Sequence, residues 1–345
     1  MMKMIRKYYF LLALTGFFIL VSVASLSGLL STYIQMVLML MGINVILTVS
    51  LNLVNGYMGE FSVGHAGFMS LGAYTSSFIT TRLLPYLLWG EPLVPVGRML
   101  YTFDVAAHAK GPIWQLIFPL TLIAGGLVAA LAGLLVAIPS FKIRGDYLAI
   151  ITLAVNYIVQ CFFANLEPLG GSRGITGIPH FTNVPWVLFW MIISLWTIRN
   201  FVYSTYGKGI MAIREDEVAA EAMTVNTRRI KVLAFCTSSF FAGIGGGLLA
   251  HLLLYINPAT FSILKSVEPL IMVYLGGPAS ISGSLLGAVV YTGLLELMRP
   301  LEVWRWVILP LLLVFLMLFR RKGIMGGEEF KLLLPREVEY APASD

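Results

Sequence analysis

The residues best suited to act on another molecule lie in one charged segment, residues 204–231, between two long apolar runs. Within residues 209–224, apolar and charged side chains alternate at helical spacing, which predicts an amphipathic helix. A helix on a membrane surface favours a basic polar face, whereas this face is mostly acidic. We therefore expect the helix to dock into a groove on a partner protein. The expected docking residues are Ala212, Arg214, Glu215, Asp216, Glu217, Ala219, Ala220 and Glu221.

A second group of polar side chains lies among glycines at residues 52–68, where two apolar runs meet. Small residues let helices approach closely, and polar groups at membrane depth are expensive unless they are paired or functional. Two interpretations fit: a tight helix contact around a hydrogen-bonded His65, or the lining of a translocation path. The glycine break at residues 276–278 is a second candidate for that lining. The path candidates are Asn52, Asn55, Ser62, His65, Ser70, Gly276, Gly277 and Ser280.

The sequence contains no catalytic or metal-binding pattern. Its four histidines are scattered, without metal-ligand spacing or a Ser-His-Asp arrangement. The glycine-rich residues 169–179 lack the Gly-Lys-Ser/Thr ending of a phosphate-binding loop. We expect no cofactor on this chain, so any ATP and Mg must be bound by another polypeptide. Glu268 and Glu296 flank the broken apolar segment, either as an ion-coupling pair or as ordinary helix-end residues.

The composition defines the environment that must position these residues. The chain has 345 residues, of which 58% are hydrophobic and only 12% are charged, with a mean hydropathy of +0.86. Soluble domains carry about 25% charged residues, so this is a polytopic membrane protein. The net charge of +6 does not indicate nucleic-acid binding, because the basic residues sit at the ends of apolar runs.

The apolar runs predict an all-α fold with about 8–10 transmembrane helices. We expect one transmembrane domain over residues 1–322, including the loop 204–231, and a cytoplasmic tail at 323–345. Residues 82–111 form an exposed loop between spans. The predicted spans are residues 8–30, 32–54, 61–81, 113–138, 147–164, 186–203, 232–255 and 304–319, with a broken segment at 267–297.

Orientation follows from the distribution of Lys and Arg, which favour the cytoplasmic side. With the N-terminus inside, most of the 23 basic residues are inside, and so is the charged segment 204–231. The broken segment must then begin and end outside. It is either re-entrant, with irregular backbone buried in protein or facing a cavity, or a pair of short spans.

Several stretches of the chain resemble the permease subunits of branched-chain amino acid ABC importers. Two of them, Gly-Asp-Tyr-Leu-Ala-Ile-Ile-Thr-Leu-Ala at residues 145–154 and Gly-Gly-Ser-Arg-Gly-Ile-Thr-Gly-Ile-Pro at 170–179, are similar to the longer member of the usual permease pair. The other similar stretches are residues 52–74, 212–223, 231–235 and 276–288.

The resemblance implies a multi-pass subunit of a bacterial inner membrane with both termini cytoplasmic. It also implies four kinds of partner besides lipid: a second permease, two cytoplasmic ATPases, an external solute-binding protein and a small solute. No nucleic acid is implied. The charged segment would be the coupling helix that fits a cleft in an ATPase. Alternatives are a urea or short-amide permease of the same family and an ion-coupled secondary transporter.

One position departs from the family pattern. The family usually has glycine after the Ala-Met pair, whereas Thr224 stands there in this chain. Threonine has a poor propensity for helix interiors and can still end a helix, so docking is still expected.

Overall fold

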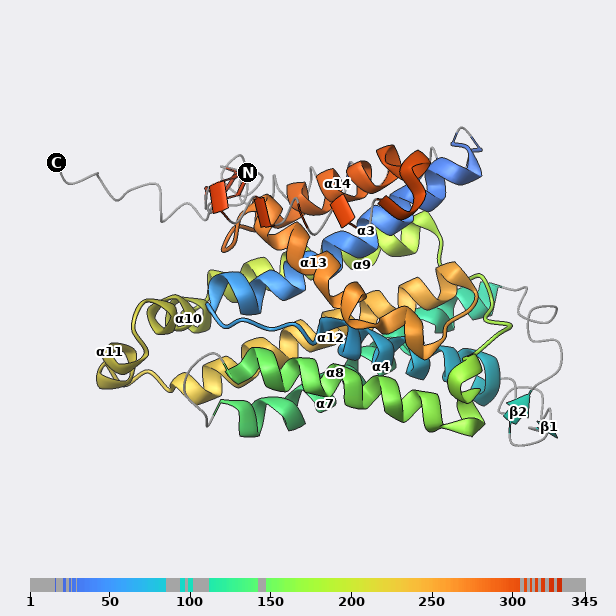
Figure 1. Ribbon diagram of the computed structural model, residues 1–345, viewed down its shortest axis with the longest axis horizontal. Coiled ribbons are helices and arrows are strands. Elements are labelled where there is room, and N and C mark those ends of the chain that lie inside the picture. Colours follow the sequence, from blue (N-terminus) through green and yellow to red (C-terminus); the bar gives the residue numbers. More distant parts are fainter. Residues whose placement is uncertain are drawn as a thin grey trace, which may run out of the picture.

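The computed structural model is a bundle of long helices that run roughly along one axis (Figure 1). Two short helices, α10 and α11, project from one end of the bundle, and a small β-hairpin lies at the opposite end. The structure describes residues 30–84, 94–96, 99–101, 112–141 and 147–304, with scattered positions between 16 and 28 and between 307 and 330.

The described helices confirm an all-α membrane architecture. Six of them are long and apolar enough to cross a bilayer. The long helices and their neighbours are α3 (Thr32–Asn52), α4 (His65–Phe78), α7 (Pro112–Ser140), α8 (Tyr147–Asn165), α9 (Val184–Val202), α12 (Thr227–Leu253), α13 (Ile263–Gly276) and α14 (Ile281–Leu297). Short 3-10 turns follow α8 at Glu167–Leu169 and Gly171–Arg173, precede α13 at Pro258–Phe261, and follow α14 at Arg299–Trp304.

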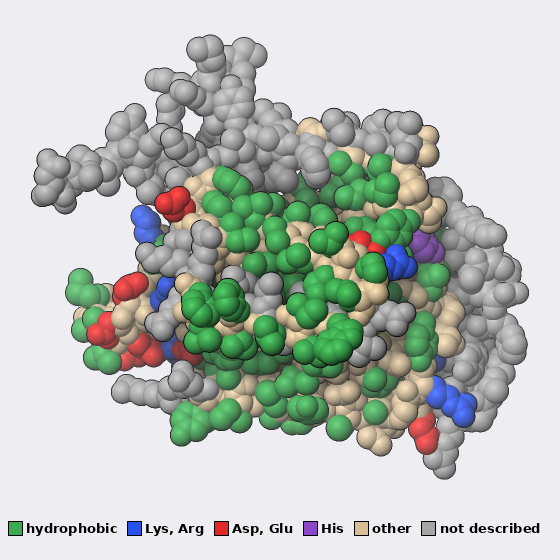
Figure 2. Space-filling model, turned by 45° about the horizontal axis from the view of Figure 1, so that its top comes forward, with side chains coloured by type: hydrophobic (Ala, Val, Ile, Leu, Met, Phe, Trp, Pro, Cys, Tyr) green, Lys and Arg blue, Asp and Glu red, His purple; other side chains and the backbone are tan. Residues whose placement is uncertain are grey.

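Helices α3 and α12 form the centre of the bundle. In the most apolar stretch of each helix, 78% of the residues are buried in α3 and 72% in α12, compared with 22% in α8. Side chains of α8 such as Ile150 and Ile158 are 65% exposed. Figure 2 shows hydrophobic side chains across the middle of one face, with most charged side chains towards the two ends. This is the pattern of a protein surrounded by lipid.

Helices α4 and α12 cross at very short range because small residues line the crossing. A Cβ added at Gly72 would collide with the backbone of Gly243, and one at Gly246 with the carbonyl oxygen of Met69. Such close backbone approach is how apolar helices associate where no hydrophobic effect acts between them. The glycines of α12 therefore allow the backbone of α4 to pack directly against it.

The predicted span 61–81 is an unbroken helical run, but it begins four residues later than expected, at His65. Helix α3 ends in a π-helical turn, η1 (Leu53–Tyr57), and α4 begins only at His65 and continues into a second π-helical turn, Ile79–Leu83. We call residues 58–64 between them the 58–64 linker; they are non-helical. Asn55 and Ser62 hold the linker through two hydrogen bonds, of 3.3 and 3.2 Å, so local side-chain bonds replace helix here.

The broken segment is a hairpin of two helices. At about 1.5 Å of rise per residue, the 14 residues of α13 and the 17 of α14 each approach the thickness of a bilayer core. Gly277 ends α13 with φ 117°, a conformation that favours glycine. The expected loop 82–111 contains an antiparallel hairpin, β1 (Val94–Val96) and β2 (Met99–Tyr101), paired Val94 to Tyr101. The predicted span 8–30 lies largely outside the described residues, as does 304–319.

Candidate coupling surface and path segment

The charged segment forms two helices, α10 (Thr205–Glu215) and α11 (Glu217–Ala222), and not the single helix expected over residues 209–224. Asp216 separates them with extended backbone, φ −158° and ψ 113°. Its carboxylate accepts hydrogen bonds from the amides of Val218 (2.8 Å) and Ala219 (3.0 Å). Aspartate is a strong N-cap residue, and these bonds satisfy two amides that a new helix leaves free. The prediction of one helix was therefore wrong.

The faces of α10 and α11 are divided between packing and solvent. Ile213 and Ala220 are buried at 5% exposure, whereas Val218 is 65% exposed and Met223 77%. Among the predicted docking residues, Ala220 faces inward and Glu217 is half-buried. The others are exposed: Ala212, Arg214, Glu215, Asp216, Ala219 and Glu221. Two apolar side chains, Val218 and Met223, are thus exposed beside charged residues on the projecting helices.

The end of α11 shows what Thr224 does in place of glycine. Thr224 adopts left-handed backbone with φ 65°. The amide of Val225 donates to the carbonyl of Ala220 at 3.1 Å, and that of Thr224 to Glu221 at 3.0 Å. These bonds are those of a helix end closed by a left-handed residue, for which glycine is the usual choice. The chain keeps the glycine geometry with a β-branched side chain, at a cost of about 1–2 kcal/mol.

Replacing Thr224 with glycine should therefore stabilise the protein by about 1 kcal/mol. The expected measurement is a higher midpoint of thermal unfolding in detergent, with slower hydrogen exchange at the amides of α11. The matched control is Thr237→Gly inside α12, where glycine should destabilise by about 1 kcal/mol. Equal shifts of the same sign in both variants would contradict this account of Thr224.

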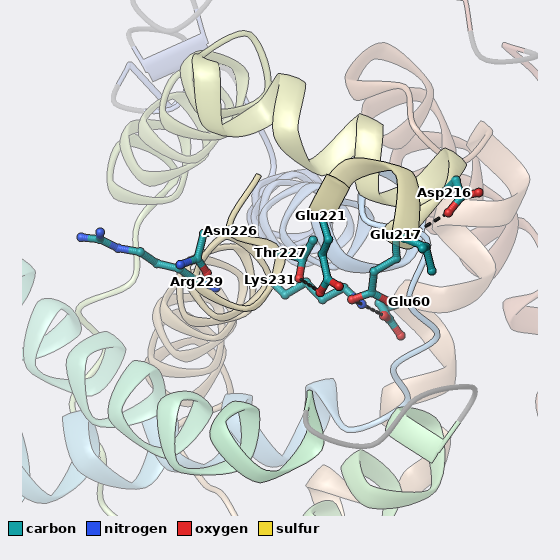
Figure 3. A network of polar contacts seen from close by, with 9 residues as sticks. Glu60, Asp216, Glu217, Glu221, Asn226, Thr227, Arg229 and Lys231 are labelled. Atoms are coloured by element: carbon teal, nitrogen blue, oxygen red, sulfur yellow. Dashed lines mark hydrogen bonds and ion pairs between the residues drawn. The ribbon is translucent and has the colours of Figure 1, made fainter. Parts of the chain in front are cut away.

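Lys231, in α12, joins α11 to the 58–64 linker (Figure 3). Its ammonium lies 2.7 Å from a carboxylate oxygen of Glu60 and 2.8 Å from one of Glu217. The Lys231 side chain is 7% exposed, and those of Glu60 and Glu217 are 22% and 41% exposed. Three separate elements (α11, α12 and the linker) therefore meet at one charge.

A second contact links the same segments. Gly59 has φ +75°, and an added Cβ there would stand 3.0 Å from Cγ of Arg214, so Arg214 of α10 lies directly on the linker. At the start of α12, Thr227 donates to Glu221 at 2.9 Å, which ties the end of α11 to α12. Glu217, Glu221 and Arg214, predicted for docking alone, thus also have partners within the chain.

Asn52 fastens the α13–α14 turn to α3. Its amide nitrogen donates to the Ser280 carbonyl (2.9 Å) and the Ser284 hydroxyl (2.7 Å). Its amide oxygen accepts from the Ala279 backbone at 3.0 Å. Asn52 is completely buried, and Ala279 has left-handed backbone with φ 59°. The structure thus brings together Asn52 and Ser280, two path candidates from distant parts of the sequence.

His65 occupies the start of α4 and pairs with α3. Its Nε2 lies 3.0 Å from the Ser50 hydroxyl, and the ring is 3% exposed. Ser70 donates within α4 to the carbonyl of Gly67 at 2.8 Å. These contacts agree with the interpretation of a tight helix contact around a hydrogen-bonded histidine. A role of the path candidates in lining a translocation path stays a prediction.

The two acidic residues beside the broken segment are both paired. Glu268 accepts from Lys265 at 2.6 Å, and Glu296 from Arg299 at 3.2 Å, each partner being three residues away on the same stretch. Glu296 also accepts a hydrogen bond from Tyr33 of α3. Glu268 is a buried residue in the second turn of α13, and Glu296 lies near the end of α14. Because each carboxylate has its own basic partner nearby, these contacts do not support an ion-coupling pair.

Glu329, in the C-terminal segment, is a contact residue that the sequence did not reveal. Its carboxylate accepts from the backbone amides of Ile281 (2.5 Å) and Ser282 (3.1 Å), the first residues of α14. It also accepts from the hydroxyls of Ser282 (2.5 Å) and Tyr57 (2.9 Å). An anion at a helix N-terminus is favourable, and this one joins α14 to η1. No local pattern announces such a contact, because it depends on the tertiary position of the tail.

These features define a class of protein. A bundle of membrane-length helices, broken at two polar glycine segments and carrying a projecting charged helix pair at one end, is the membrane subunit of a transport system. Residues 33–319 match the family model described as "Branched-chain amino acid transport system / permease component". The chain belongs to that family of transport permeases.

The relatives agree with this assignment. The chain is 30% identical over 318 residues to the high-affinity branched-chain amino acid transport system permease protein LivM of Salmonella typhimurium, covering 82% of this chain and 68% of the relative. The protein of the same name in Escherichia coli is 29% identical with the same coverage. A probable branched-chain amino acid permease LivM of Methanocaldococcus jannaschii is 26% identical, covering 75% of this chain and 79% of that one. No solved structure matches the chain.

Proposed function

We propose that the chain is the longer permease subunit of an ABC importer that carries leucine, isoleucine and valine into the cell. Family membership supports the transport role, and the observation that carries the ATP-driven mechanism is the exposed surface of α10 and α11. In this proposal a second permease completes the membrane part, and two ATPases bind ATP and Mg in the cytoplasm. A solute-binding protein delivers the solute from outside.

The mechanism we propose is alternating access. Closure of the ATPases on ATP pushes α10 and α11, and the bundle then re-orients around the solute path. This requires the α10–α11 end to face the cytoplasm of a bacterial inner membrane, with both termini on that side, as the distribution of basic residues predicts. The candidate path segments, residues 52–70 and 276–283, are polar and tied to one another through Asn52. No bond in the solute is broken.

The substrate class rests on the names of the LivM relatives. Urea and short amides are the alternative within the family, because the solute-binding protein largely selects what is carried. Uptake of labelled leucine, compared with labelled urea, in a strain that lacks the endogenous chain decides between them. Urea uptake without leucine uptake would remove the amino-acid proposal and leave the permease role intact.

The docking proposal is tested by placing a charge on the exposed apolar pair. Val218→Arg and Met223→Arg should each reduce co-purification of the ATPases, because each variant would bury a charge without a partner in the contact, at a cost of about 2 kcal/mol, or roughly 30-fold in affinity. Ala220, which is buried, is a poor probe, since a large residue there would disturb packing within the chain.

The matched control is Ser172→Arg, an exposed residue in the 3-10 turn Gly171–Arg173, in the connection between α8 and α9. This variant should retain the ATPases and fold normally, as judged by size-exclusion chromatography. If the ATPases co-purify undiminished with Val218→Arg and Met223→Arg, α10 and α11 are not the docking surface.

A further inference from the structure

We propose that Lys231 is a positioning residue that transmits the displacement of α11 to the 58–64 linker, and through it to α3, α4 and α8. The inference rests on the proposed function, because it presumes that a partner moves α11. It assigns a route for that movement to three charged side chains: Glu217, Lys231 and Glu60.

The charge of Lys231 lies where water has little access. Lys231 belongs to the first turns of α12 and is 6% exposed. Its ammonium lies 5.8 Å from the ring centre of Phe141, at the end of α7. Few water molecules can therefore replace a lost carboxylate. A buried ammonium is costly without its partners, so Glu60 and Glu217 have to stay within reach of Lys231 as α11 moves.

The Lys231 contacts reach a segment that is far away in the sequence: Glu60 lies in the 58–64 linker, whereas Glu217 and Lys231 belong to the neighbouring helices α11 and α12. Glu217 is the first residue of α11, a helix of 6 residues in which most of the other side chains are exposed. Glu60 lies in the linker, far away in the sequence. Arg214 contacts Gly59 beside it, so both projecting helices press on the same short non-helical segment. A movement of the projecting pair is therefore passed directly to the linker, as well as to α9 and α12, which adjoin the pair in the sequence.

The linker is connected to three membrane helices, α3, α4 and α8. Asn55 of η1 holds Ser62 through the paired hydrogen bonds described above. The amide of Val63 donates to the Thr152 hydroxyl of α8 at 3.2 Å. Directly after the linker, His65 starts α4 and pairs with Ser50 of α3. A shift of Glu60 would thus reach α3, α4 and α8 through these contacts. Coupling between sites needs such a contiguous set of contacts and a demonstration that it carries energy.

The experiment measures solute uptake per ATP hydrolysed, with the assembled transporter in vesicles. Glu60→Gln keeps the size of the side chain and the Lys231–Glu217 pair, and it removes only the charge on the linker. We expect assembly and ATP hydrolysis to continue while uptake per ATP falls about tenfold. Glu60→Asp keeps the charge on a shorter side chain, and its ratio should lie between those of wild type and Glu60→Gln.

The matched control is Glu296→Gln, which breaks another Arg or Lys pair at a helix end. Its ratio of uptake to hydrolysis should equal that of wild type. An unchanged ratio in Glu60→Gln overturns the proposal, whether uptake and hydrolysis both persist or both fall together as a merely structural role predicts. Failure of the docking proposal would be recognised separately, because the ATPases would remain bound to Met223→Arg.

Discussion

Adding a single methyl group at Gly246 is expected to be among the most damaging small changes in this protein. The Cβ of Gly246→Ala would lie well under 3.0 Å from the backbone carbonyl oxygen of Met69, so α4 and α12 would have to move apart. Overpacking costs typically 1–3 kcal/mol, and a clash with backbone belongs at the upper end, at about 3 kcal/mol. Thermal unfolding of the purified protein in detergent measures the loss.

The control for Gly246→Ala is Gly293→Ala in α14. An added Cβ at Gly293 meets nothing within 4 Å, so alanine should instead stabilise the helix by about 0.5–1 kcal/mol. The two substitutions are chemically identical and opposite in expected sign. If both raise the unfolding midpoint, the crossing of α4 and α12 is wider than described.

Asn52→Leu should cause the second large loss of stability. Leucine has a similar size but would leave the Ala279 amide without its side-chain partner, whereas the Ser280 carbonyl keeps its bonds from Ser284. A buried polar group left unpaired costs about 1–3 kcal/mol. We expect a loss of about 2 kcal/mol, with faster hydrogen exchange at the amide of Ala279, because that residue has left-handed backbone held by the lost bond.

Asn165→Leu provides the comparison. Asn165 is exposed at the end of α8 and makes one hydrogen bond, to the Cys161 carbonyl at 2.8 Å. Its replacement should change stability by less than about 0.5 kcal/mol. A similarly small effect of Asn52→Leu would show that the α13–α14 turn holds its position without Asn52.

Composition and hydropathy predicted most of the membrane architecture, because a long apolar run has few alternatives to a helix. The same logic began one span at residue 61, before the helix starts at His65, and joined residues 209–224 into one helix. Both errors have one cause. Side chains such as Asn55 and Asp216 accept hydrogen bonds from nearby backbone amides, which ends helical structure locally without changing the apolar spacing around them.

The candidate site was predictable in outline and not in its connections. The charge pattern located the projecting segment, and the glycine-rich polar stretches located the segments that Asn52 joins. The sequence showed Lys231 only as one residue of a stretch that resembles the family, since its role depends on Glu60, which is 171 residues away. No sequence pattern around Glu329 indicated its contacts with α14 and η1.

The contact of Glu329 with the start of α14 also has a practical consequence for handling the protein. A chain cut before Glu328 would lose the carboxylate that receives the amides of Ile281 and Ser282, and a reporter fused at that point would carry bulk into the same place. Affinity tags and fluorescent fusions therefore belong after Asp345, with residues 323–330 kept intact. Comparing the expression yield of such a fusion with that of a truncated one gives a rapid, inexpensive measure of how much the tail contributes to folding.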